Sequence, residues 1–178
     1  MLPGRRYRSP KSKRRSDADA LTATPGRQDC EGFVRVFLDT NVLLAACVRQ
    51  HPHFSRADEV MRRCVTKKDE GIVHTHSLLE FHSAITQLPK GLAVPPSQVP
   101  DLLKEGVLVC VRLVALPAKD LVSVERRAGE KGLIGGIIYD FFHLCVAVRE
   151  GVDRFYTFNT AHFRSIAEPD FRDRIVAP

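Results

Sequence analysis

Apolar residues along the chain alternate between two patterns, which predict strands and helices in turn. Short, dense apolar runs suit buried strands, and stretches with an apolar residue every three or four positions suit one face of a helix. The expected strands are residues 33–38, 71–76, 107–116 and 154–158. Because strands that alternate with helices form parallel sheets, the pattern predicts a three-layer α/β/α fold with a central, mainly parallel sheet of four or five strands.

Helices are expected between these strands, and their ends have recognisable signals. The expected ranges are 42–49, 56–68, 77–88, a short helix ending near residue 106, 117–129 and 133–150. Ser55 to Asp58 is a plausible capping signal for the second helix, and Gly71 is expected to close it. The last helix has an apolar stripe that reaches Val148, and Gly151 is expected to end it.

The length and composition fit one domain with a sizeable core. The chain has 178 residues, 44% of them hydrophobic, and no apolar run approaches the roughly 20 residues that span a bilayer. Its five cysteines are widely spaced, include no Cys-x-x-Cys pair and are odd in number. Together with the lack of a signal peptide, they favour a reducing compartment. We therefore expect a soluble, cytoplasmic protein that does not bind a membrane.

Positive charge is concentrated at the N-terminus. Residues 1–30 carry eight basic and three acidic side chains, which accounts for +5 of the net charge of +6 and leaves +1 for residues 31–178. Large apolar residues are few there, so we expect residues 1–31 to be a disordered tail and residues 32–178 to form the domain. The tail is either a solvated extension or a non-specific arm for nucleic-acid phosphates.

Four acidic or amide side chains are placed near the ends of predicted strands. Asp39 and Asn159 directly follow the first and fourth strands. Glu80 lies in the first turn of the helix after the second strand, and Asp140 lies in the long helix after the third. The carboxyl ends of parallel strands share one edge of a sheet, so these side chains can meet there. Clustered carboxylates repel one another unless a cation lies among them, and an all-oxygen set suits Mg²⁺ or Mn²⁺.

Each of these residues also has a purely structural interpretation. Asp39 and Asn159 are common types of turn residue at strand ends. Glu80 could complete a capping box with Ser77 by bonding back to its backbone. Asp140 is harder to explain in this way, because an unpaired charge on a largely apolar helix is costly, and a buried or cleft position is expected for it.

Four segments of the chain carry a family resemblance. They are Val36–Leu44 (VFLDTNVLL), Thr75–Phe81 (THSLLEF), Gly135–Asp140 (GGIIYD) and Tyr156–Phe163 (YTFNTAHF). In this order and spacing they resemble the PIN domain, in particular the VapC-like toxins of bacterial toxin–antitoxin pairs, over about residues 33–178. The resemblance implies that Asp39, Glu80 and Asp140 are three acidic metal ligands. Asn159 takes a fourth position that is Asp in many relatives, which lowers the charge of the site.

The resemblance implies a Mg²⁺- or Mn²⁺-dependent endoribonuclease toxin, with RNA as its substrate, an antitoxin protein as its partner, and a homodimer as its assembly. A metal-bound water, oriented or deprotonated by Glu80, would attack the phosphodiester and leave 5′-phosphate and 3′-hydroxyl ends. Thr40, Asn41 and Thr157 are expected to bond to the carboxylates or to metal-bound waters. His162 is either a contact for substrate phosphate or a packing histidine.

Two other classes of function stay open on the sequence. A PIN-like module could bind RNA or protein without cleaving, although three intact carboxylates argue against this. A phosphatase of the haloacid dehalogenase type also has an acid after its first strand. That class needs Asp-x-Asp, however, and this chain has Asn41 two residues after Asp39.

Overall fold

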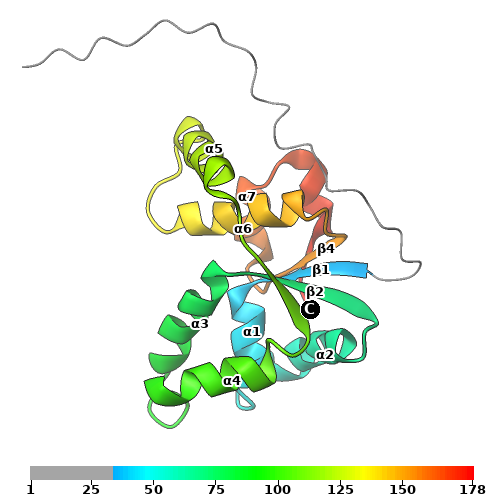
Figure 1. Cartoon of the computed structure of the whole chain (residues 1–178), viewed down its shortest axis with the longest axis vertical. Coiled ribbons are helices and arrows are strands. Elements are labelled where there is room, and N and C mark those ends of the chain that lie inside the picture. Colours follow the sequence, from blue (N-terminus) through cyan, green and yellow to red (C-terminus); the bar gives the residue numbers. More distant parts are fainter. Residues whose placement is uncertain (1–33) are drawn as a thin grey trace, which may run out of the picture.

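A parallel five-stranded sheet forms the centre of the molecule (Figure 1). The computed structural model describes residues 34–178. Its strands are β1 Val34–Leu38, β2 Asp69–His74, β3 Val111–Val114, β4 Arg154–Tyr156 and β5 Ile175–Val176. They lie in the order β3-β2-β1-β4-β5, and every neighbouring pair is parallel. The predicted α/β sheet is thus confirmed, whereas the predicted tail of residues 1–31 lies outside the described residues.

Helices cover both faces of the sheet. The helices are α1 Thr40–Cys47, α2 Phe54–Val65, α3 His76–Thr86, α4 Val99–Gly106, α5 Ala118–Glu130, α6 Ile137–Arg149 and α7 Thr160–Ile166, with short 3-10 helices η2 Pro96–Gln98 and η3 Pro169–Arg174. Figure 1 shows α1 to α4 on one side of the sheet and α5 to α7 on the other. Within residues 34–178, no helix has the length and apolar character needed to cross a membrane.

The central strand β1 joins the two layers because its side chains alternate between them. Val36 and Leu38 are fully buried in a cluster with α1, α2 and α3. Phe37 points to the other face, where its ring stacks on Phe155 of β4 at 4.9 Å. Burial on both sides explains why the inner part of β1, from Val36 to Leu38, is entirely apolar, as is usual for an inner strand of a parallel sheet.

Both predicted ends of the second helix, and the role predicted for Gly71, are wrong. Helix α2 begins at Phe54, and its N-cap His53 makes no side-chain capping bond, so the expected signal at Ser55–Asp58 lies inside the helix. Asp58 instead pairs with Arg62 one turn later. Gly71 does not close the helix but lies inside β2, where an added Cβ would be 3.0 Å from both Cys64 Sγ and Val111 Cγ1. The glycine therefore permits close packing between β2 and its neighbours.

The start of the long helix is also later than predicted. Helix α6 begins at Ile137 and not at residue 133, because Gly135 adopts a φ of +65° in the turn before it. Val148, expected in the apolar stripe, is 49% exposed. Helix α1 starts earlier than expected, at Thr40, because Asp39 caps it. Helix α7 and strand β5 were not individually predicted.

Candidate active site

Asp39, at the end of β1, is hydrogen-bonded to the start of α1 and to the segment that follows β4. It is the N-cap residue of α1, and its Oδ1 accepts a hydrogen bond from the Thr40 backbone N (2.7 Å). Its Oδ2 accepts a second from Thr157 Oγ1, also at 2.7 Å. Only 5% of the residue is exposed. Asp39 is therefore both the helix cap allowed by the structural interpretation and a buried carboxylate held at the carboxyl edge of the sheet.

Asn41 and Thr157 join the first and fourth strand ends around that carboxylate. The Asn41 Nδ2 donates to Thr157 Oγ1 (3.0 Å), and the Asn41 Oδ1 accepts from the Phe158 backbone N (3.1 Å). The backbone N of Asn159 also donates to Thr157 Oγ1 at 3.0 Å. Thr157 follows β4 and is fully buried, and its hydroxyl uses its whole hydrogen-bonding capacity. It accepts two bonds and donates the third to Asp39, which fixes the direction of that carboxylate.

Glu80 points from α3 toward the same edge. Its Oε2 accepts a hydrogen bond from Thr40 Oγ1 at 2.6 Å. The alternative of a capping box with Ser77 is wrong, because α3 begins at His76 with Thr75 as its N-cap, and Ser77 is inside the first turn. His76 Nε2 lies 3.6 Å from Glu80 Oε1, one turn earlier on the same helix. The carboxylate is therefore held between Thr40 and His76.

Asp140 lies in the first turn of α6, with 34% of its side chain exposed. Its Oδ2 accepts a hydrogen bond from His162 Nε2 of α7 at 2.8 Å. Burial raises the pKa of Asp140 and the negative charge of Asp39 adds to the rise, while His162 and His143 oppose it. The two aspartates are thus close enough to repel each other, and His162 contacts a carboxylate of the site.

Asn159 is the predicted site residue that the structure does not join to the acids through its side chain. It is the exposed N-cap residue of α7, but its side chain forms no capping bond. Only its backbone N reaches the site, through Thr157. Asn159 therefore lies at the predicted carboxyl edge of the sheet, but no side-chain contact within the described residues indicates its role.

His143 is a site residue that sequence reasoning missed. It is 1% exposed on α6, with its Nδ1 3.8 Å from Asp39 Oδ1 and its Nε2 3.5 Å from Glu80 Oε2. Its Nδ1 has no hydrogen-bond partner within the described structure. The signal that could have found it is its position three residues after Asp140, which places both on neighbouring positions of one helix.

The three carboxylates suit a divalent cation in kind, although their side chains are not arranged around one. No group of three or more His, Cys, Asp or Glu side chains in residues 34–178 has the arrangement of a metal site. His143 lies between Asp39 and Glu80, and His162 is bonded to Asp140. The donors are nevertheless hard oxygens at one edge. Burial, with the negative charge of Asp39 adding to it, raises the pKa of Asp140, and a cation would offset both effects.

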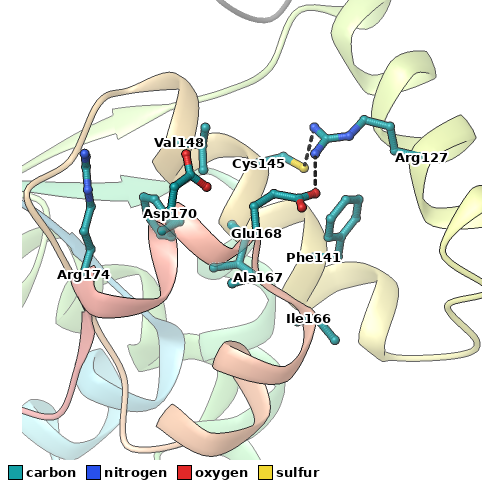
Figure 2. A pocket seen from close by; sticks show the side chains of 11 residues that line it. Arg127, Phe141, Cys145, Val148, Ile166, Ala167, Glu168, Asp170 and Arg174 are labelled. Carbon is teal, nitrogen blue, oxygen red and sulfur yellow. Dashed lines mark hydrogen bonds and ion pairs between the residues drawn. The ribbon is translucent and has the colours of Figure 1, made fainter. Parts of the chain in front are cut away.

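A separate pocket of about 220 Å³ lies among α5, α6, α7 and η3. Figure 2 shows its apolar floor, which includes Phe141, and its charged rim. Within that rim Arg127 already pairs with Glu168 at 3.3 Å and contacts Cys145 Sγ at 3.8 Å. The pocket contains none of the predicted site residues, so the acidic edge and not this pocket is the candidate site.

Comparisons with known proteins agree with this fold. The sequence model of the PIN domain matches residues 36–169. The structure of Mycobacterium tuberculosis VapC20, described as a sarcin-ricin loop cleaving toxin, is similar with a TM-score of 0.52 at 16% identity. The match covers 75% of this chain and 99% of that chain.

The structure of VapBC2 from Rickettsia felis, bound to a DNA fragment from its promoter, gives a TM-score of 0.53 at 19% identity and covers 75% of this chain and 93% of that chain. A comparison with curated proteins found no match. At these identities the two structures establish the fold alone. The family resemblance seen in the sequence is confirmed, and the chain belongs to the PIN domain family.

Proposed function

We propose that the chain is a metal-dependent endoribonuclease that hydrolyses RNA phosphodiester bonds, and that it is the toxin of a toxin–antitoxin pair. The observation that carries this proposal is the convergence of Asp39, Glu80 and Asp140 at the carboxyl edge of the sheet. His143, three residues after Asp140 on α6, lies 3.8 Å from Asp39 and 3.5 Å from Glu80. Membership of the PIN domain family and the similarity to VapC structures support it.

The residues of the site have distinct roles in this proposal. Asp39 and Asp140, with Glu80, would hold Mg²⁺ or Mn²⁺, which when bound supplies a Lewis acid and lowers the pKa of a water. Thr157 and the Thr40 backbone fix the direction of the Asp39 carboxylate, and the Thr40 hydroxyl fixes Glu80. Glu80 orients or accepts a proton from the attacking water, so the products carry 5′-phosphate and 3′-hydroxyl ends.

The position of His162 suggests that it acts through Asp140. Its Nε2 already bonds to Asp140 Oδ2, so it orients this carboxylate, and it is free to contact phosphate only when that bond opens. Asn159, at the N-cap of α7 beside the same edge, has an exposed side chain that could reach a phosphate or a metal-bound water.

Partners are part of the proposal. A toxin of this kind would be held inactive by a cognate antitoxin and would form homodimers in the cytoplasm. The similarity to VapBC2 supports the proposal of an antitoxin partner.

The test is cleavage of total cellular RNA by the purified protein, with Mg²⁺ or Mn²⁺, with EDTA, and with the Asp140→Asn variant, followed by sequencing of the new ends. Metal-dependent cuts that carry 5′-phosphates and disappear in the variant are expected. If a folded preparation free of antitoxin cleaves nothing, the alternative of a PIN-like module that binds without cutting replaces the nuclease.

A further inference from the structure

A pair of stacked aromatic rings lies beside the acidic cluster and takes no part in the core. The ring of Tyr139 on α6 stacks on that of His76 on α3, with centroids 5.0 Å apart and planes 17° from parallel. Tyr139 is 51% exposed. One face of the tyrosine is thus supported by His76, and much of the remaining ring is open to solvent.

The stacked pair is fixed by a row of rings that leads to the core. The His76 ring lies 6.5 Å from Phe142, and Phe142 meets the buried His74 edge-on at 4.3 Å. Burial lowers the pKa of His74 to about 3, so this ring is neutral and packs as an aromatic group. A ring held in this way loses little conformational freedom when a ligand stacks on it.

The position of the pair relates it to the proposed chemistry. Tyr139 directly precedes Asp140, and His76 lies one helical turn before Glu80, with its Nε2 3.6 Å from the Glu80 carboxylate. The two rings therefore flank two of the three acids, from both helices that supply them. A phosphate bound at those acids would bring an adjoining base next to the Tyr139 ring.

The surroundings of the pair favour an unpaired base. Leu79, three residues after His76 on α3, and Ile138, next to Tyr139, are exposed apolar side chains. Bases stack on aromatic rings only when their faces are free, which occurs in single strands and loops and not inside a duplex. An acidic surface alone would not retain RNA, so stacking supplies attraction that the carboxylates cannot.

We propose that Tyr139, supported by His76, is a stacking platform for an unpaired RNA base next to the phosphate that is cut. This inference rests on the proposed nuclease function and adds to it a base-binding contact beside Asp140 and Glu80. Recognition by stacking accepts any base, so the platform provides affinity and selects for unpaired RNA without reading sequence.

The experiment measures RNA affinity by fluorescence anisotropy in an Asp39→Asn background, which prevents cleavage and keeps a good capping residue. The ligands are a labelled oligoadenylate and an abasic strand of the same length. Tyr139→Ala should weaken oligoadenylate binding by about tenfold or more, the usual size of a lost base–aromatic stack. Tyr139→Phe retains the ring and should bind within about twofold of the background protein.

Two controls make the result specific to stacking. Val122→Ala removes an exposed apolar side chain on α5 and should leave affinity unchanged. The abasic strand should bind more weakly than oligoadenylate, and Tyr139→Ala should cause no further loss with it, because the two changes remove the same contact.

Failure of this inference can be separated from failure of the proposed function. If the parent protein cleaves RNA with metal but Tyr139→Ala binds oligoadenylate normally, the platform is refuted and the nuclease stands; the ring is then open to a protein partner. Equal affinity for the abasic strand, or no RNA binding in the background protein, also refutes the platform. If Tyr139→Ala weakens binding but no RNA is ever cleaved, the nuclease is refuted and the stacking contact stands.

Discussion

Thr157→Val tests whether Asp39 is held as the structure indicates. The substitution keeps the shape of a fully buried side chain but removes a hydroxyl that donates to Asp39 Oδ2 at 2.7 Å and accepts from Asn41 and the Asn159 backbone. A hydrogen bond to a charged group contributes about 1.5–3 kcal/mol, and a buried partner left unsatisfied adds to the loss. We expect the free energy of unfolding to fall by about 2–4 kcal/mol.

Urea denaturation followed by circular dichroism measures this loss. For a chain of this size, each kcal/mol corresponds to about 2–4 °C in Tm, so a fall of roughly 5–15 °C should accompany it. Thr157→Ser retains the hydroxyl and should lose much less. Thr66→Val is a matched control, because the Thr66 hydroxyl is exposed and bonds only to helix carbonyls that water can reach.

The same variant should also weaken function, because residues that orient metal ligands typically alter metal affinity or activity by about 10–100-fold. A change in unfolding free energy of less than about 0.5 kcal/mol would refute the reasoning. So would a Thr157→Ser variant as unstable as Thr157→Val, since the loss would then come from packing and not from the hydrogen bonds.

Four further predictions concern other parts of the structure. Gly71→Ala should destabilise the fold by about 1–3 kcal/mol in urea, because its Cβ would crowd Cys64 and Val111, whereas Gly129→Ala in α5 has open space and should be neutral or stabilising. Burial raises the pKa of Asp140 in the folded protein, so the folded state loses stability as pH rises through that pKa and the carboxyl ionises. Asp140→Asn should therefore raise the Tm at pH 7. This gain should vanish in acid, where the parent carboxyl is neutral. His162→Ala removes the bond that lowers the Asp140 pKa, so the acid limb of the cleavage pH profile should move to higher pH; an unmoved limb would contradict this. Mg²⁺ or Mn²⁺ should raise the Tm of the parent protein but not of Asp140→Asn, and equal shifts in both would place the cation elsewhere.

The sheet and its acidic edge could be predicted from sequence because each strand leaves a local signal. The apolar run of β1 ends abruptly at Asp39, and such a break is visible without knowledge of the fold. Strand β5 leaves no such signal, because its two residues form a strand only by pairing with β4. Gly71 was misread because a glycine after a helix commonly ends it, and the need for close packing against Cys64 appears only in three dimensions.

The residues of the site were predictable to different degrees, because some have a local signal in the sequence and others are placed only by the packing of distant elements. Asp140 was identified because a charge on an apolar helix is unusual. His143 was missed because a histidine on a helix is compatible with simple packing, and its closeness to Asp39 and Glu80 depends on how α6 crosses the edge of the sheet. For Asn159, sequence predicted the edge correctly but could not show that the side chain is exposed.

The double role of Asp39 has a consequence for how inactive forms of this protein would arise. Because its carboxylate both caps α1 and ties β1 to the segment after β4, most replacements would lower the amount of folded protein as well as its activity. Asp140 is partly exposed, and both burial and the negative charge of Asp39 disfavour its carboxylate, so a neutral amide would relieve both effects. In a cell under selection against the proposed cleavage, loss at Asp140 would leave an abundant, folded protein, whereas loss at Asp39 would tend to remove the protein itself.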